Sequence, residues 1–203
     1  PRPTPTSIPR TDGDMTQAVL FNHTATLLED GRVLVTGGQT SATDGAYPPL
    51  PPRPGVISAQ IYDPATGRWS PTSPMSVPRT HHDAVMLEDG TVLVAGGLTE
   101  EFTLDGVTGD PDYVVPIASA EVYDPFSETW SSVGNMPEEM VRLIGTRNNR
   151  PAIMLEMLEN GKVLAVGGLG PSAALYDASS GKWVAAGEAP SPEHKNRQWH
   201  TSM

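Results

Sequence analysis

The chain has 203 residues, a formal net charge of −11 and no cysteine, and it contains 20 glycines and 21 prolines. Without cysteine it can form neither disulfides nor thiolate metal sites, and its acidic charge disfavours nucleic acid, because phosphate binding needs clustered Lys and Arg. No apolar stretch is long enough to cross a bilayer, so no membrane span is predicted. The abundance of turn-forming residues indicates an all-β protein.

Residues 1–14 begin with several prolines and predict a stiff, polyproline-like linker. They lack the apolar core of a signal peptide, so any secretion signal would lie upstream. The sequence leaves cytoplasmic and extracellular or cell-surface locations open, with a slight preference for the latter. Residues 15–203 are predicted to hold the folded part of the chain.

Three segments share one pattern, in which Asp-Gly or Asn-Gly precedes an apolar run that ends in Gly-Gly. They are Leu28 to Gly38, Leu87 to Gly97 and Leu158 to Gly168. Because Asp-Gly and Asn-Gly accept positive φ, each segment predicts a strand, a two-residue turn and a second strand. The first strands are expected at His23 to Leu28, His82 to Leu87 and Ile153 to Leu158.

A second pattern follows each Gly-Gly, with a Tyr-Asp pair and then a Trp at the same offset each time. The pairs are Tyr62 with Trp69, Tyr123 with Trp130 and Tyr176 with Trp183. The turn-forming residues between them predict another hairpin, so each unit contains four strands, as does the blade of a β-propeller. The large aromatic rings are expected to fill the space between neighbouring blades.

Gly-Gly, Tyr-Asp and Trp in this order resemble the kelch repeat, whose period is roughly 50 residues. The resemblance implies three four-stranded antiparallel blades, at about residues 22–70, 80–131 and 152–184. Residues 197–203 align with Arg79 to Val85, which predicts the first strand of another blade. Because closed propellers have roughly four to eight blades, an incomplete ring is expected. A C-terminal continuation, a companion fragment or a second copy would then supply the missing blades.

Long insertions separate the second and third strands in two of the predicted blades, at Gln39 to Ser58 and Leu98 to Ser119. The second insertion contains Asp105, Asp110 and Asp112, which could offer oxygen ligands to calcium or simply be solvated. Loops on a rigid scaffold commonly carry recognition, so both insertions are candidate binding surfaces.

The connector that follows the second blade carries three arginines. Arg142, Arg147 and Arg150 form a local basic cluster in an acidic chain, which could bind a carboxylate or phosphate. Alternatively, these arginines pair with acidic loops of adjacent blades.

Three histidines share one register, at the start of the predicted innermost strands: His23, His82 and His200. Such a set could bind a metal near the propeller axis, because imidazole is a common ligand. Ile153 takes the same position in the third blade, which favours a structural role. In that interpretation the histidines hydrogen-bond to loop backbone.

The chain is also similar to the propellers of galactose oxidase and glyoxal oxidase. That resemblance implies a copper-ligating Tyr-His pair before such a strand, but the matching pairs here are Asn22-His23, His81-His82 and Trp199-His200. None contains tyrosine, and without cysteine the family's Tyr-Cys cofactor cannot form within this chain. No hydrolase elbow, zinc-protease motif, P-loop or dinucleotide fingerprint is present either.

These observations favour a non-catalytic binding or structural module that presents its loops to a protein or carbohydrate partner. No cofactor is predicted in this chain. One alternative is a fragment of a secreted galactose-oxidase-like enzyme, which would need copper. Another is an extracellular assembly subunit that joins its neighbours through open blade edges.

Overall fold

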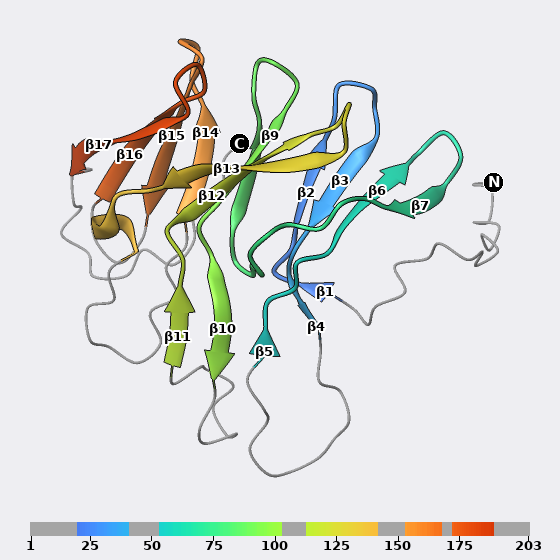
Figure 1. The fold of residues 1–203 in the computed structure, drawn as a ribbon, viewed down its shortest axis with the longest axis horizontal. Coiled ribbons are helices and arrows are strands. Elements are labelled where there is room, and N and C mark those ends of the chain that lie inside the picture. The colour runs from blue at the N-terminus through green and yellow to red at the C-terminus, as the bar shows by residue number, and fades with distance from the viewer. Residues whose placement is uncertain (1–19, 41–52, 103–112, 142–152, 168–171, 189–203) are drawn as a thin grey trace, which may run out of the picture.

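We analysed a computed structural model of the chain, which describes residues 20–40, 53–102, 113–141, 153–167 and 172–188 (Figure 1). These residues form strands and one short 3₁₀ helix, η1, at Glu138–Met140. None of the helical structure among them is long or apolar enough to cross a membrane.

Three four-stranded antiparallel sheets form the body of the structure. Blade 1 contains β2 (Thr24–Leu27), β3 (Val33–Thr36), β6 (Ala59–Asp63) and β7 (Arg68–Pro71). Blade 2 contains β8 (Asp83–Met86), β9 (Val92–Ala95), β12 (Ser119–Asp124) and β13 (Thr129–Asn135). Blade 3 contains β14 (Ile153–Met157), β15 (Lys162–Gly167), β16 (Ser172–Asp177) and β17 (Lys182–Glu188).

In each sheet the strands lie side by side in chain order, as expected for a propeller blade. The three blades stand next to one another in an arc, and their ring is not closed (Figure 1). The innermost strands β2, β8 and β14 are neighbours across the two blade junctions. The prediction of three four-stranded blades in an incomplete ring is therefore confirmed.

The first hairpin of each blade differs from the prediction in its turn. In blade 1 the Gly31 amide donates to the Leu28 carbonyl at 3.0 Å, and the Leu28 amide donates to the Arg32 carbonyl at 2.8 Å. Gly31 has φ +85°, whereas Asp30 is not in the left-handed region. The connection is thus a three-residue loop that ends in a left-handed glycine, and the predicted two-residue turn was wrong.

The physical reason for this difference lies in the aspartate. The Asp30 carboxylate accepts a hydrogen bond from the Arg32 amide at 2.9 Å, which holds Asp30 in an ordinary turn conformation and leaves positive φ to the glycine alone. The same bond recurs from Thr91 to Asp89, at 3.0 Å, and from Lys162 to Asn160, at 3.2 Å.

An aspartate also organises the outer hairpin of each blade. Asp63, Asp124 and Asp177 each accept hydrogen bonds from an amide and a hydroxyl of the following turn, as in the 2.8 Å bonds from Ala65 N and Thr66 Oγ1 to Asp63. The turn hydroxyl is the main cause of the lowered pKa of each carboxyl. This role explains why Asp follows Tyr in all three blades.

Two apolar cores lie between the blades. Tyr123 of blade 2 packs with Leu34 and Ile61 of blade 1, and Tyr176 of blade 3 packs with Leu93 and Ala120 of blade 2. Each tyrosine ring also lies about 5 Å from the tryptophan opposite it in its own blade, at 5.0, 5.0 and 5.1 Å. The expectation that these aromatics fill the space between blades is confirmed at both junctions.

Two smaller sheets lie at one end of the blades. β1 (Leu20–Phe21) pairs with β4 (Gln39–Thr40), and β10 (Leu98–Phe102) pairs with both β5 (Arg53–Pro54) and β11 (Tyr113–Pro116). The second of these sheets joins the insertions of blades 1 and 2, so these two loops are linked through their backbones.

Candidate functional site

Most of the predicted site residues lie outside the described part of the chain. These are Asp105, Asp110, Asp112, Arg142, Arg147, Arg150 and His200. The acidic and basic binding sites proposed for them stay predictions. His23 and His82 are described, and they differ: His23 is exposed, whereas His82 is only 6% exposed.

The Gly-Gly pairs make room for the next blade. A Cβ on Gly37 would lie 2.5 Å from both the Arg79 carbonyl oxygen and Cε1 of His82, and one on Gly96 would lie 2.9 Å from Cδ1 of Ile153 in blade 3. Gly37 and Gly96 also have positive φ. Glycine is therefore required here both by backbone conformation and by the close approach of the next blade.

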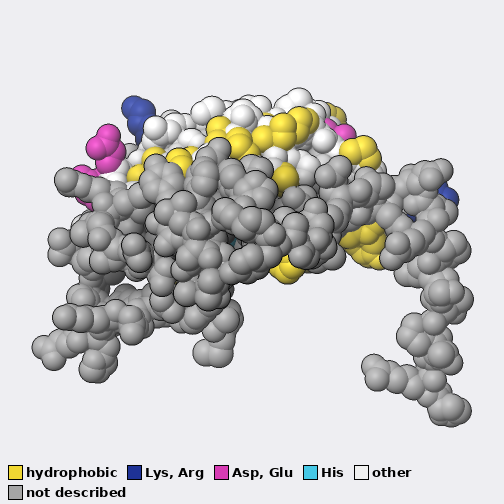
Figure 2. Space-filling view, turned by 90° about the horizontal axis from the view of Figure 1, so that it is seen from below, with side chains coloured by type: hydrophobic (Ala, Val, Ile, Leu, Met, Phe, Trp, Pro, Cys, Tyr) yellow, Lys and Arg dark blue, Asp and Glu magenta, His cyan; other side chains and the backbone are white. Residues whose placement is uncertain are grey.

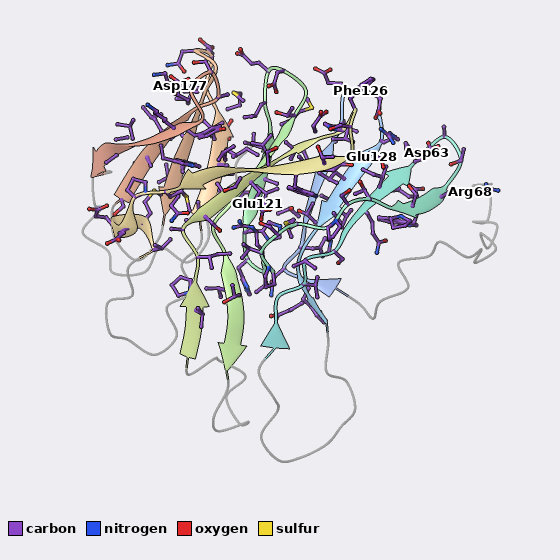
Figure 3. The ribbon with its side chains drawn as sticks, in the orientation of Figure 1. Asp63, Arg68, Glu121, Phe126, Glu128 and Asp177 are labelled. Carbon is purple, nitrogen blue, oxygen red and sulfur yellow. The ribbon has the colours of Figure 1, made fainter. Side chains whose placement is uncertain are left out.

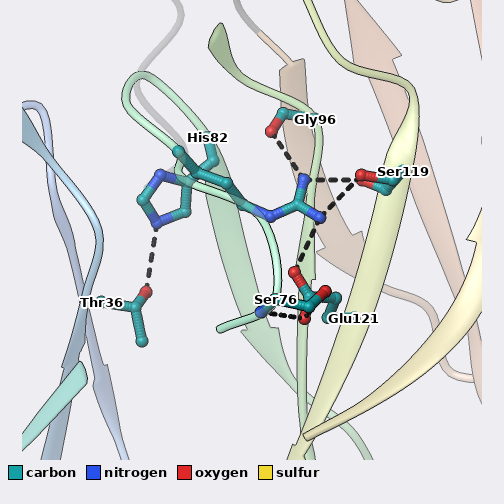
Figure 4. Close-up of polar contacts among 7 residues, drawn as sticks. Thr36, Ser76, His82, Gly96, Ser119 and Glu121 are labelled. Atoms are coloured by element: carbon teal, nitrogen blue, oxygen red, sulfur yellow. Dashed lines mark hydrogen bonds and ion pairs between the residues drawn. The ribbon is translucent and has the colours of Figure 1, made fainter. Parts of the chain in front are cut away.

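His82 sits at the junction of blades 1 and 2, where it contacts two hydroxyls of blade 1. Its Nε2 lies 3.1 Å from Oγ1 of Thr36 (Figure 4). It also lies 3.1 Å from Oγ1 of Thr24, and the two hydroxyls are 2.8 Å apart. The sequence predicted a hydrogen bond to loop backbone, but the partners are side chains on β2 and β3.

Burial keeps His82 neutral. It lowers the pKa of the imidazole from 6.5 to about 3, and the positive charge of Arg79 acts in the same direction. The second ring nitrogen, Nδ1, is buried with no hydrogen-bond partner among the described residues. A neutral imidazole between two threonines is a packing and hydrogen-bonding element of the blade junction.

The described residues do not fit a copper site. No group of three or more His, Asp or Glu side chains among them lies close enough to hold a metal. Nε2 of His82 is already engaged by the threonine hydroxyls, and Nδ1 faces the position that a Gly37 side chain would occupy. The metal-binding prediction for His23, His82 and His200 therefore gains no support from this part of the chain, and we derive no copper chemistry for it.

A buried ion pair that the sequence did not reveal lies beside His82. Arg79 is fully buried, and its Nη2 donates to Glu121 Oε1 at 3.1 Å and to Ser119 Oγ at 2.9 Å (Figure 4). Its Nη1 donates to the carbonyls of Ser119 and Gly96, at 2.7 and 3.1 Å. Burial lowers the pKa of Arg79, and Glu121 opposes that change.

Glu121 completes this network through a loop that leads out of blade 1. Its Oε2 accepts hydrogen bonds from the Ser76 amide and hydroxyl, at 2.8 and 2.7 Å. The pair thus fixes the connector between blades 1 and 2 against β12. A buried charge pair of this kind needs such additional hydrogen bonds to offset its desolvation.

Asp83 makes the corresponding link from blade 2 to blade 3. Its Oδ2 accepts a 2.7 Å hydrogen bond from the Leu155 amide, and its Oδ1 accepts one from the Ala84 amide at 2.8 Å. Burial nevertheless raises the pKa of this carboxyl. Arg79, Glu121 and Asp83 are all structural groups of the blade junctions that the sequence patterns did not single out.

Comparison with known proteins fits this geometry. No family model matches the chain. Over 115 residues it is 30% identical to the F-box/kelch-repeat protein At1g16250 of Arabidopsis thaliana. This match covers 56% of the present chain and 26% of the plant protein. A solved fungal alcohol oxidase of the AA5 family, in complex with copper, matches with TM-score 0.57 and 25% identity, over 85% of this chain and 31% of that protein.

This chain is a run of kelch-type β-propeller blades. Its fold is also that of the galactose-oxidase-like propellers, as the structural match shows. It spans about a quarter of the length of the plant protein and about a third of the oxidase. The activities of whole proteins with such blades therefore enter only as proposals below.

The outer rim of the propeller carries one unusual turn. Phe126 in blade 2 is 99% exposed, and Glu128 has φ +54° where blades 1 and 3 have Gly67 and Gly181 (Figure 3). The cost of left-handed backbone for a non-glycine residue is roughly 1 kcal/mol.

Exposed apolar side chains are present elsewhere on the propeller as well. Seen from below, groups of hydrophobic side chains are spread over the visible part of the described surface, and charged ones lie toward its two ends (Figure 2). Leu27 and Val184, in blades 1 and 3, are 64% and 62% exposed. Both terminal blades of the arc thus carry an exposed apolar side chain.

Proposed function

We propose that this chain is a non-catalytic propeller module that presents the insertions of blades 1 and 2 to a protein or carbohydrate partner. The observation that carries the proposal is the sheet of β5, β10 and β11, in which strands from the two insertions pair at one end of the blades. Pairing turns two separate loops into one platform, and rigid scaffolds with such loops commonly serve recognition.

The inner-strand residues support a structural rather than a catalytic interior. His82 is enclosed by threonines and glycine, and Arg79 is enclosed by Glu121, Ser119 and backbone carbonyls. Each of these groups already has a role in joining the blades. The recognition surface is therefore expected on the insertions.

Shortening the insertions tests this proposal. Replacing residues 41–52 and 103–112 by short linkers leaves the three blades and the sheet of β5, β10 and β11, and removes the segments of the two insertions that connect these strands. Binding of both proteins to immobilised glycans and to a peptide library is then compared. We expect ligands retained by the parent chain to be lost by the shortened one, with unchanged circular dichroism. Equal binding by both would overturn the proposal.

A fragment of a copper oxidase is the second candidate, and the similarity to the copper-bound fungal alcohol oxidase favours it. In that case the copper ligands would come from outside the described residues. Two measurements distinguish the two functions. One is calorimetric titration of the chain with Cu²⁺, and the other is the release of peroxide when an alcohol is added. Tight copper binding with alcohol-dependent peroxide would refute the non-catalytic proposal.

Assembly through open blade faces is the third candidate, and the exposed apolar side chains of blades 1 and 3 favour it. Missing blades from a continuation, a companion fragment or a second copy would cover these faces. Light scattering and electron microscopy of the purified chain test this idea. Monodisperse single particles would argue against assembly between copies.

A further inference from the structure

The two blade junctions differ in chemistry at one structurally equivalent position. At the first junction the imidazole of His82 meets the hydroxyl of Thr36, with 3.1 Å between Nε2 and Oγ1. Cε1 of the same ring lies 2.5 Å from where a Gly37 Cβ would be. His82, which precedes the innermost strand of blade 2, therefore lies between a hydroxyl and a glycine of blade 1.

At the second junction the same place is apolar. Ile153 is the counterpart of His82, and its Cδ1 lies 2.9 Å from where a Gly96 Cβ would be. Ala95 is the counterpart of Thr36, because each precedes the Gly-Gly pair and each lies opposite the innermost and third strands of its blade. Ala95 and Ile153 are both buried in one apolar core.

We propose that Thr36 with His82, and Ala95 with Ile153, are matched pairs that specify which blade follows which. A mixed Ala–His pair would leave the buried imidazole with one hydroxyl partner, Thr24, instead of two, and a mixed Thr–Ile pair would leave the Thr24 and Thr36 hydroxyls bonded only to each other, against an aliphatic side chain. Both arrangements are unfavourable because each loses a hydrogen bond between buried polar groups. The inference is independent of whether the insertions bind a ligand.

Matched pairs of this kind would help similar blades to dock in the correct order. The blades share their Gly-Gly pairs, their Tyr-Trp pairs and their turn aspartates, so the large apolar contacts alone discriminate poorly between them. Repeat proteins characteristically misfold by wrong docking and domain swapping. A difference at one buried position at each junction favours the correct neighbour by disfavouring the wrong one.

A double-mutant cycle in the full chain tests the proposal. We would measure urea unfolding midpoints for Thr36→Ala, His82→Ile and the double variant at pH 8, where His82 is neutral and Arg79 stays charged. Each single variant makes a mixed pair, and the double variant recreates the apolar pair of the second junction. We expect the double variant to unfold at a higher midpoint than the sum of the single shifts predicts.

A matched control separates this coupling from general loss of stability. The control combines Thr36→Ala with Ile153→Val, which lie at different junctions and belong to different pairs. The shifts in unfolding midpoint that these two substitutions cause should therefore add. The reciprocal cycle, Ala95→Thr with Ile153→His, should show recovery of the midpoint lost by Ile153→His alone. This second cycle decides the matter if His82→Ile alone fails to fold.

Size-exclusion chromatography gives a second readout that a merely local packing role would not move. Variants with one mixed pair should form more domain-swapped dimer on refolding than the parent chain or the matched double variant. Additive midpoints in both cycles, or equal dimer fractions in mixed and matched variants, would overturn the proposal.

Discussion

His82 should make the stability of the propeller sensitive to acid. Burial lowers its pKa in the folded state to about 3, whereas the unfolded chain has the ordinary value of 6.5. Below pH 6.5 the unfolded state therefore binds a proton at this imidazole that the folded state does not bind. As a result, the free energy of unfolding decreases as the pH is lowered. By linkage this loss is about 2.7 kcal/mol at pH 4.5 relative to pH 8. Only about 0.2 kcal/mol of it should occur above pH 7.

His82→Ile is the comparison variant for this pH series, because it removes the titrating imidazole and Ile153 occupies the equivalent position in blade 3, while the Thr24 and Thr36 hydroxyls can still bond to each other. Urea unfolding of both proteins at pH 8, 6.5, 5.5 and 4.5 gives the difference in stability at each pH. Relative to His82→Ile, the free energy of unfolding of the parent chain should decrease by about 2.7 kcal/mol between pH 8 and pH 4.5.

Taking the difference removes the other titrating groups from the comparison. Asp83 is one of them: burial raises its pKa, so its contribution to stability increases as the pH falls, opposite in sign to that of His82. It is present in both proteins and cancels. Parallel stability curves for the parent and His82→Ile from pH 8 to pH 4.5 would refute the buried, neutral imidazole.

Three further predictions concern the other junction and turn residues. Glu121→Ala should lower the free energy of unfolding by about 3–5 kcal/mol, because it leaves Arg79 charged and buried. The control is Gln60→Ala, at the equivalent position of blade 1, which should lower it far less. Chemical denaturation measures both. Gly37→Ala should destabilise well beyond the roughly 1 kcal/mol expected for Gly67→Ala, because both have positive φ but only Gly37 is within 2.5 Å of blade 2, and thermal unfolding compares the two. Glu128→Gly should raise the melting temperature by relieving left-handed backbone worth up to about 1 kcal/mol, and an unchanged or lower value would contradict the strain assigned to this turn.

The blades could be predicted because their signals are local and repeated. Apolar runs before Gly-Gly mark the second strands, and Tyr-Trp pairs mark the outer hairpins, each within a short stretch of sequence. The type of the first turn was missed because Asp-Gly suits both a two-residue turn and a three-residue loop. Only the hydrogen bond from the Arg32 amide to Asp30 selects the second form.

The junction residues could not be predicted in the same way. Arg79 and Glu121 are 42 positions apart and come together only because the connector folds back against β12. The sheet of β5, β10 and β11 was missed for a related reason. Pro54 lacks a backbone donor and argues against a strand, yet β5 tolerates it at the edge of the sheet beside β10.

The same comparison between blades indicates what a partner of blade 3 must supply. Leu34 and Leu93 are 1% and 0% exposed because the tyrosine of the next blade packs against them. Their counterpart Leu164 is only half-buried, and it lies in a row with Leu175, which is also half-buried, and Val184. Covering this row requires an aromatic and aliphatic face like the one that blades 2 and 3 offer to the blades before them. We therefore expect a further blade of the same kind to bind there, since a polar surface would leave the apolar row unsatisfied.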